Sequence, residues 1–292
     1  MAKASIPVDL SNPGQVFACM GFLEAADVLL GNAVGGFGWG QSGDFLKLCA
    51  NANENPFRIV LSFLKTADVR WLSPRNDLSE RDGGCTKVLP GIAASNDPKA
   101  PDLQGILYGK YEGDLEREIP FGYWADGSGR FATTFKKSTN GASSHIRVKN
   151  ALDAIKHLDL RDAECDPFNQ VARTESLFRL DPRGVVDPIH GGFSPDTVRK
   201  GAIGGIDMRV ATYPLCELLA VIGLEQARPE GLDGTHFAYS IWDRMLPPVL
   251  ARAALGGHVA LGRIRRFVVE HKEVKQGGDR KMTDIREELK AS

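Results

Sequence analysis

Two apolar helical segments constrain what this chain can fold into. Residues 13–30 and 214–224 are almost continuously apolar, and each opens on a proline, which suits the first position of a helix. Each segment also holds an internal glycine, Gly21 or Gly223, although a glycine inside a helix costs about 1 kcal/mol against alanine. Such a glycine is tolerated where another backbone packs closely, so we expect two buried core helices that meet at these residues. The alternative is an internal duplication, which would put both helices in equivalent places.

Asparagine followed by proline predicts where two helices begin. Asn12 can accept a backbone N–H as N-cap, Pro13 fits the first helical position, and Gln15 can reach back to the cap. The same pair recurs at residues 55–56, and residues 166–168 are a third candidate. Including two segments with helical spacing of apolar residues, helices are predicted near residues 12–30, 55–67, 150–160, 213–226 and 249–255.

Hairpin signals outnumber strand–helix–strand signals between these helices. Residues 106–108 with 119–124, and residues 258–275, are typical of strands. We therefore expect an α+β fold in which antiparallel strands and hairpins pack with apolar helices.

The length of 292 residues allows one domain, 1–292, or two closely packed halves with a boundary near 160–175. The last residues, 276–292, are polar, and Thr283 can cap a short helix there. We expect a polar C-terminal tail or helix over these residues.

The loop Gly38–Gly43 has the spacing G-x-G-x-x-G that cradles a dinucleotide pyrophosphate. That motif requires a helix directly after the loop and an acidic residue about 20 positions further on. Residues 44–47 are too short for such a helix, and the window near residue 63 holds no carboxylate. We interpret Gly40 to Gly43 as the turn of a hairpin; the alternative is a nucleotide-dependent enzyme that uses this loop.

The sequence lacks the patterns that mark catalytic or metal sites. It has no G-x-S-x-G or H-E-x-x-H motif, and its histidines are isolated from one another. Five cysteines stand singly, which argues against a disulfide framework or a zinc site. We expect a protein that is no enzyme and holds no cofactor or metal. Without a long apolar run or a secretory signal, we also expect a cytoplasmic protein that does not bind membranes.

Two basic segments indicate a polyanionic partner. Residues 126–157 contain six Lys or Arg and two Asp, and residues 251–292 contain ten Lys or Arg and six Asp or Glu, so each carries a local charge of +4. Polar residues between the cations of the first segment can also donate hydrogen bonds to phosphate. The alternative is a solvated basic hairpin. The residues that we expect to contact nucleic acid are Arg130, Lys136, Lys137, Arg147, Lys149, Arg263 and Arg265.

Several stretches together resemble one protein family. These stretches are residues 6–19, 21–27, 126–128, 178–184 with its Asp-Pro-Arg-Gly, 192–195, 214–229 and 246–255. The chain resembles, over most of its length, the CRISPR-associated proteins of type I-U (also called I-G) systems that are grouped with the large, Cas-eight-type subunits of Cascade.

This resemblance implies a non-enzymatic subunit of an RNA-guided surveillance complex that acts in antiviral defence. Its partners would be other CRISPR effector subunits, the guide RNA (crRNA) and target DNA. A length of 292 residues is short for a large subunit. The alternative is therefore a smaller, RAMP-like RNA-binding subunit with an RRM-like core, although the sequence shows no clear glycine-rich RAMP loop.

Overall fold

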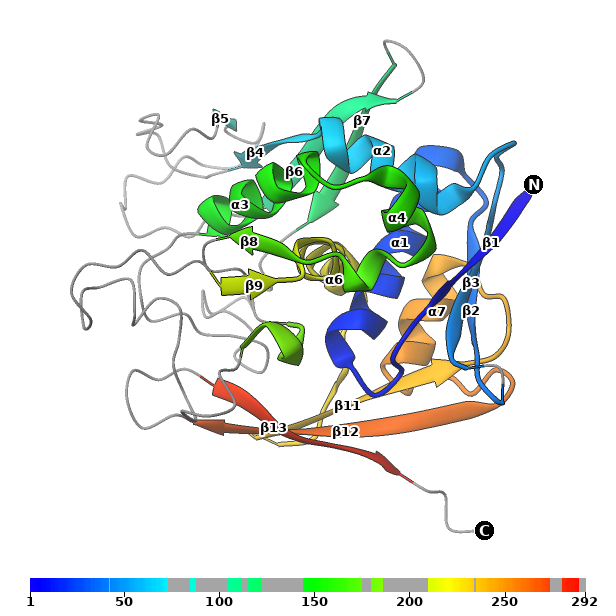
Figure 1. The fold of residues 1–292 in the computed structure, drawn as a ribbon. Coiled ribbons are helices and arrows are strands. Elements are labelled where there is room, and N and C mark those ends of the chain that lie inside the picture. The colour runs from blue at the N-terminus through cyan, green and yellow to red at the C-terminus, as the bar shows by residue number, and fades with distance from the viewer. Residues whose placement is uncertain are drawn as a thin grey trace, which may run out of the picture.

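The computed structural model describes residues 1–41, 43–72, 85–87, 104–111, 115–121, 144–174, 180–185, 210–233, 235–273 and 280–288. Helices pack against one another and against small, mainly antiparallel sheets (Figure 1), so the predicted α+β class is confirmed. The helices are α1 (Pro13–Leu30), α2 (Pro56–Thr66), α3 (Ser144–Lys156), α4 (Leu160–Cys165), α6 (Pro214–Gln226) and α7 (Pro248–Leu255), with short 3-10 helices η1 (Pro167–Asn169) and η2 (Pro182–Val185).

The strands form three larger sheets and one small one. The first sheet holds β1 (Ala2–Pro7), β3 (Phe45–Ala50) and β2 (Val34–Gly38) in this spatial order. The second holds β5 (Cys85–Lys87), β4 (Asp68–Leu72), β6 (Gln104–Tyr111) and β7 (Leu115–Phe121), and the third holds β10 (Glu230–Gly231), β11 (His236–Trp242), β12 (Ile264–Glu273) and β13 (Arg280–Glu288). Strands β8 (Ala172–Thr174) and β9 (Val210–Thr212) pair with each other.

Helices α1 and α6 cross in the middle of the molecule at two glycines (Figure 1). A Cβ added to Gly21 would lie 1.9 Å from the carbonyl oxygen of Leu219, and one added to Gly223 would lie 2.2 Å from that of Phe17. Neither position can carry a side chain while the two backbones keep this separation. The prediction of two buried helices that meet at Gly21 and Gly223 is confirmed.

The two helix starts at Asn-Pro pairs are also confirmed. The Asn12 side chain accepts a hydrogen bond from the backbone N–H of Gln15, and Asn55 accepts one from the N–H of Phe57. Gln15, however, does not reach back to the cap: its Oε1 accepts from the backbone N–H of Asp9, 2.8 Å away. The third candidate, at residues 166–168, is only a turn of 3-10 helix with no side-chain cap.

Helix α1 is also long and apolar enough to cross a membrane by the usual length and hydropathy test. The inference that the sequence contains no such run is therefore wrong. In the fold, 83% of this 18-residue segment, Pro13–Leu30, is buried inside the protein, against α6 and the first sheet. Here α1 is a core helix, and its apolar composition is explained by this burial.

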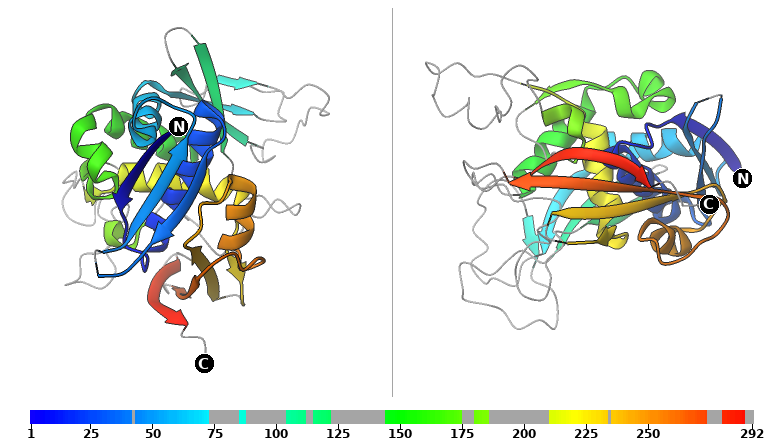
Figure 2. Two further views of the ribbon diagram at one scale, coloured as in Figure 1. Left: turned by 90° about the vertical axis from the view of Figure 1, so that its right-hand side faces the viewer. Right: turned by 90° about the horizontal axis from the view of Figure 1, so that it is seen from below.

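The first sheet has one buried face, and its outer face is open at Lys3, Ser5 and Lys47 but covered at Gly36 by the backbone of Arg244. Strand β3 lies between β1 and β2 and runs antiparallel to both, α1 connects β1 to β2, and α2 follows β3. This is the element order that opens the β-α-β-β-α-β folds, but β4 joins the second sheet instead of completing this one. Leu46, Leu48 and Phe37 point inward to α1, and the outer face is seen in Figure 2, left.

The third sheet lies beneath the helices, with β13 at its edge (Figure 1). The prediction of a polar tail or helix over 276–292 is wrong, because residues 280–288 form a strand that pairs with β12. Ile285 lies opposite Val269 and packs against the core, while Asp284 and Arg286 on either side of it are exposed. This alternation is typical of a strand with one covered face, and the available partner strand overrides the local capping signal.

The first basic segment, residues 126–157, is also partly reassigned. Helix α3 begins at Ser144, well before the predicted start at residue 150, so Arg147 and Lys149 belong to a helix and not to a hairpin.

Buried hydrophobic residues form one connected cluster from Ile6 to Val269. The boundary near 160–175 stays a prediction.

Candidate nucleic-acid interface

The structure places four of the seven residues predicted to bind nucleic acid. Arg130, Lys136 and Lys137 lie outside the described residues. Arg147 and Lys149 lie on α3, and the Lys149 side chain is exposed. The remaining pair, Arg263 and Arg265, lies at the start of β12, far from α3 in the sequence.

Arg263 and Arg265 meet the end of the β2–β3 hairpin at Trp39. The centres of their guanidinium groups lie 5.3 and 5.9 Å from the centroid of the indole ring, within the range of cation–π attraction. The ring is partly exposed and also packs against the edge of the hydrophobic core. We call Trp39, Arg263 and Arg265, with their acidic partners Asp243, Glu287 and Asp44, the Trp39 corner.

The two arginines of the Trp39 corner are held differently. Arg265 makes a two-point pair with Glu287, Nε and Nη2 each donating over 2.7 Å, and its side chain is only 27% exposed. Arg263 makes one side-chain bond, from Nε to Asp243 Oδ2 over 2.6 Å, and its side chain is 74% exposed. Arg265 therefore fixes the corner, while the guanidinium of Arg263 faces water and can meet a phosphate.

The pKa values of the acidic partners reflect these bonds. Hydrogen bonding from Arg265 lowers the pKa of Glu287, and hydrogen bonding from Arg263 lowers that of Asp243. Arg266 points to the other face of β12, as the strand period predicts, and pairs with Glu230 and Glu288. The predicted arginine cluster therefore narrows to one well-exposed cation, Arg263.

The glycine loop supplies the turn that brings Trp39 to this position. Gly43 has a φ of +92°, which residues with a side chain rarely adopt, and β3 follows it directly in antiparallel pairing with β2. The interpretation of Gly40 to Gly43 as a hairpin turn is confirmed. Because no helix follows the loop, a pyrophosphate would lack the helix N-terminus on which the nucleotide motif depends.

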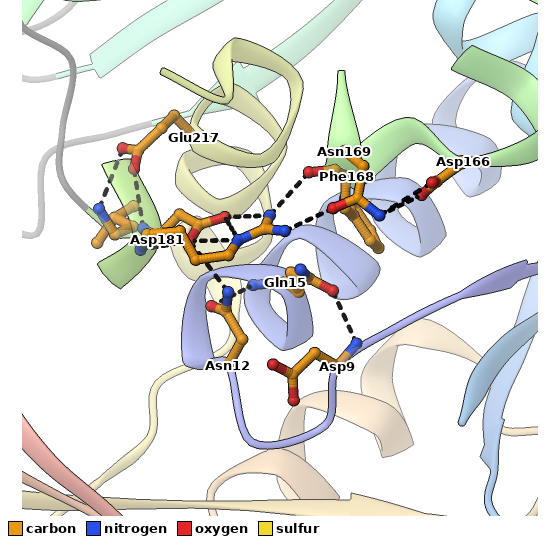
Figure 3. Close-up of polar contacts among 10 residues, drawn as sticks. Asp9, Asn12, Gln15, Asp166, Phe168, Asn169, Asp181 and Glu217 are labelled. Atoms are coloured by element: carbon orange, nitrogen blue, oxygen red, sulfur yellow. Dashed lines mark hydrogen bonds and ion pairs between the residues drawn. The ribbon is translucent and has the colours of Figure 1, made fainter. Parts of the chain in front are cut away.

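A second polar cluster lies inside the protein, and the sequence analysis did not single it out as a site (Figure 3). Asp181 is fully buried and accepts hydrogen bonds from Asn12 Nδ2, 3.0 Å away, and from Arg183 Nη2, 2.7 Å away. The carboxylate of Glu217, also buried, accepts from the backbone N–H groups of Leu180 and Asp181, at 3.1 and 2.8 Å. These bonds attach η2 to both α1 and α6.

Arg183 completes this cluster, which we call the Asp181 network. Its Nη1 donates to Asn169 Oδ1 and its Nη2 to the carbonyl oxygen of Phe168, while its guanidinium lies 4.0 Å from the ring centroid of Tyr213. The spacing Asp-Pro-Arg-Gly was the available signal, because the Asp181 side chain also caps the N–H of Arg183. The amide partners come from distant elements and could not be read from spacing.

The Asp181 network has the chemistry of a structural joint. Each carboxylate is buried and hydrogen-bonded, and these hydrogen bonds offset the free-energy cost of removing the charged group from water. The adjacent thiol of Cys216 is fully buried, and burial together with Asp181 and Glu217 raises its pKa well above the ordinary value. It is therefore a protonated thiol at neutral pH, not a nucleophile.

A pocket of about 340 Å³ lies where the end of α1 meets the start of α7. Both charged side chains of its lining are engaged: Arg252 makes a two-point pair with Glu24, and Asp27 Oδ1 accepts from the N–H of Ala33. Among the described residues, no group of three or more acidic, histidine or cysteine side chains is placed to hold a metal. The lining residues are Asp27, Asn32, Ala33, Val34, Pro247, Pro248, Val249 and Arg252.

Comparisons with protein-family models, with curated proteins and with solved structures find no match for this chain.

Proposed function

We propose that this protein is a non-catalytic subunit of a type I CRISPR surveillance complex and that it binds the crRNA or the target DNA through the Trp39 corner. Two independent lines support the proposal. The first is the resemblance of several sequence stretches to type I-U proteins. The second, which carries the binding role, is the exposed guanidinium of Arg263 beside the partly exposed ring of Trp39.

Cations and aromatic rings are the groups that bind nucleic acid without regard to sequence. Arginine pairs with phosphate through charge-assisted hydrogen bonds, and aromatic and guanidinium planes stack on unpaired bases. Arg265 contributes indirectly, because its two-point pair with Glu287 holds it beside Trp39. Binding here requires no bond-making.

Co-expression with the neighbouring CRISPR subunits and a guide RNA tests this proposal. We expect the chain to co-purify with both, and we expect Arg263→Glu to weaken binding of the assembled complex to nucleic acid, with a smaller salt dependence than the wild type. Arg58→Glu, the same charge reversal at an arginine of α2 that is 52% exposed and lies outside both basic segments, is the matched control. A protein that stays alone and guide-free beside its co-expressed neighbours would contradict the proposal.

The RAMP-like alternative is favoured by one observation, the β1–α1–β2–β3–α2 order of the first sheet. A RAMP-like subunit would contact the guide RNA, whereas a large-subunit-like protein would contact target DNA. Photo-crosslinking from position 39 in the assembled complex separates the two, since the crosslinked strand is either RNA or DNA.

A further inference from the structure

Part of the outer face of the first sheet, whose strands face the viewer in Figure 2 (left), presents two lysines to solvent. Ser5 of β1 lies opposite Lys47 of β3, and Lys3 lies two residues before Ser5, so all three share this face. All three side chains are exposed.

An aromatic ring lies on the same face. Gly38 of β2 pairs with Phe45 of β3, and a Cβ added to Gly38 would lie 2.1 Å from the tip of the Phe45 ring. The ring therefore lies over Gly38, a place that only glycine leaves open. Lys47 Nζ lies 4.9 Å from the ring centroid, so a cation and a partly exposed aromatic ring are presented together.

The charge of this face suits a polyanion. Strands β1, β2 and β3 contain two lysines and no acidic residue, and Asp44, directly before β3, lies 4.0 Å from Arg265 Nη1. Trp39 follows Gly38 directly, so the Trp39 corner lies at the hairpin end of the same sheet, where the Trp39 ring packs against the core and the Phe45 ring lies on the outer face. A ring such as Phe45 stacks on a base only when that base is unpaired, because bases inside a duplex stack on one another.

We propose that Lys3, Phe45 and Lys47 extend the Trp39 corner into a track for single-stranded nucleic acid. Phe45 stacks on a base, and the two lysines contact the neighbouring phosphates. This inference rests on the proposed function, because it names the form of nucleic acid that the same region binds. A duplex, and a protein partner on this face, are the competing occupants.

The test is a binding titration of the full-length protein with labelled single-stranded oligouridylate, single-stranded oligothymidylate and a DNA duplex of equal length, at several salt concentrations. The variants are Phe45→Leu, which keeps an apolar cover over Gly38, and Lys47→Ala. Arg58→Ala on α2, outside both basic segments, is the matched control for the loss of one exposed cation. Arg263→Ala reports on the Trp39 corner itself, and the melting temperature of each variant reports on folding.

We expect tighter binding to one or both single strands than to the duplex, with RNA and DNA compared in separate arms. Phe45→Leu should weaken single-strand binding about fivefold or more, the range for losing one stacked base. Lys47→Ala should lower the slope of log affinity against log salt by about 0.7, the value for one phosphate contact on a single strand. Arg58→Ala should change neither quantity.

The outcomes separate this inference from the proposed function. If Arg263→Ala weakens binding while Phe45→Leu and Lys47→Ala bind like the wild type with unchanged melting temperatures, the track is wrong and the Trp39 corner stands. The track would also be overturned if the wild type bound the duplex as tightly as the single strands, or if Phe45→Leu and Lys47→Ala weakened duplex binding and single-strand binding equally. If the wild type binds none of the three oligonucleotides at low salt, both proposals fail.

Discussion

Two arginines, Arg183 and Arg263, show how one residue type serves two different ends in this molecule. Arg183 lies in the Asp181 network at the junction of α1 and α6, where its donors reach a buried carboxylate, an amide oxygen and a backbone carbonyl. Arg263 lies in the Trp39 corner, where one carboxylate holds its Nε and most of the side chain faces water. The first is committed to the fold, and the second keeps its outer edge for a ligand. Arginine content alone therefore says little about binding until partners and exposure are known.

The largest expected effect lies at the helix junction. Gly21→Ala should lower the free energy of unfolding by about 3 kcal/mol or more, because the new methyl group meets the Leu219 backbone carbonyl and one helix must move. Urea denaturation monitored by circular dichroism measures the loss. Gly231→Ala, where a Cβ meets nothing within 4 Å, is the control and should be nearly neutral. Equal stability of the two variants would mean that α1 and α6 do not touch at Gly21.

A smaller but still substantial effect is expected from the Asp181 network. Asp181→Ala should lower the free energy of unfolding by about 3 kcal/mol, because Asn12 Nδ2 and the guanidinium of Arg183 lose their shared acceptor. Arg183 can still turn toward water, which keeps the loss near the lower end for a broken buried pair. Chemical denaturation gives the value, and a loss below about 1 kcal/mol would show that the network does not hold η2 in place.

Truncating each arginine tests directly whether Arg183 is structural and Arg263 is not. Arg183→Ala should cost about 2 kcal/mol of stability, since it leaves a buried carboxylate unpaired. Arg263→Ala should change stability by less than about 0.5 kcal/mol, as is usual for an exposed side chain. The melting temperatures of the two variants, measured side by side, decide the matter. If Arg263→Ala is the more damaging change, Arg263 is structural and the binding proposal loses its main residue.

The smallest expected effect concerns acid stability at the Trp39 corner. Hydrogen bonding from Arg265 lowers the pKa of Glu287 in the folded protein, so this pair adds stability above the unfolded pKa of Glu287 and the gain disappears as the pH falls through the folded value. Glu287→Gln has no such titration. The drop in melting temperature from about pH 5 to about pH 3 should therefore be smaller in Glu287→Gln than in the wild type. An identical drop in both proteins would show that the pair does not contribute.

The sequence alone was sufficient where a local signal has one physical meaning. Asn12 before Pro13, and Asn55 before Pro56, predict helix starts. The asparagine side chain accepts a backbone N–H group that has no partner within the helix, and proline has no N–H group that needs a partner. Gly21 and Gly223 predict a close helix contact for a similar reason, since their cost has to be offset by packing. The same reasoning failed at residues 280–288, because the capping signal at Thr283 is weaker than pairing with β12.

The candidate site was only partly readable from the chain. Arg263 and Arg265 stood out as a basic cluster, but Glu287 and Asp243, which bind them, lie 22 and 20 residues away in sequence, and Trp39 lies in another sheet. Phe45 gave no signal, since a phenylalanine at the start of a strand is usually a core residue; it reaches the outer face because Gly38 opposite it has no side chain. Asp181 is buried by α1 and α6, which no spacing rule brings together.

By itself the sequence determined where the helices after Asn12 and Asn55 begin, which glycines must touch another backbone, and where a turn has to reverse the chain, because each depends on steric and hydrogen-bonding rules that act within a few residues. Only the tertiary structure decided which cations are paired and which face water, because an ion pair forms between side chains that the fold brings within about 3 Å from distant elements. In this protein that second step separates Arg183, Arg265 and Arg266, which have partners inside the fold, from Arg263, which is left largely exposed beside Trp39.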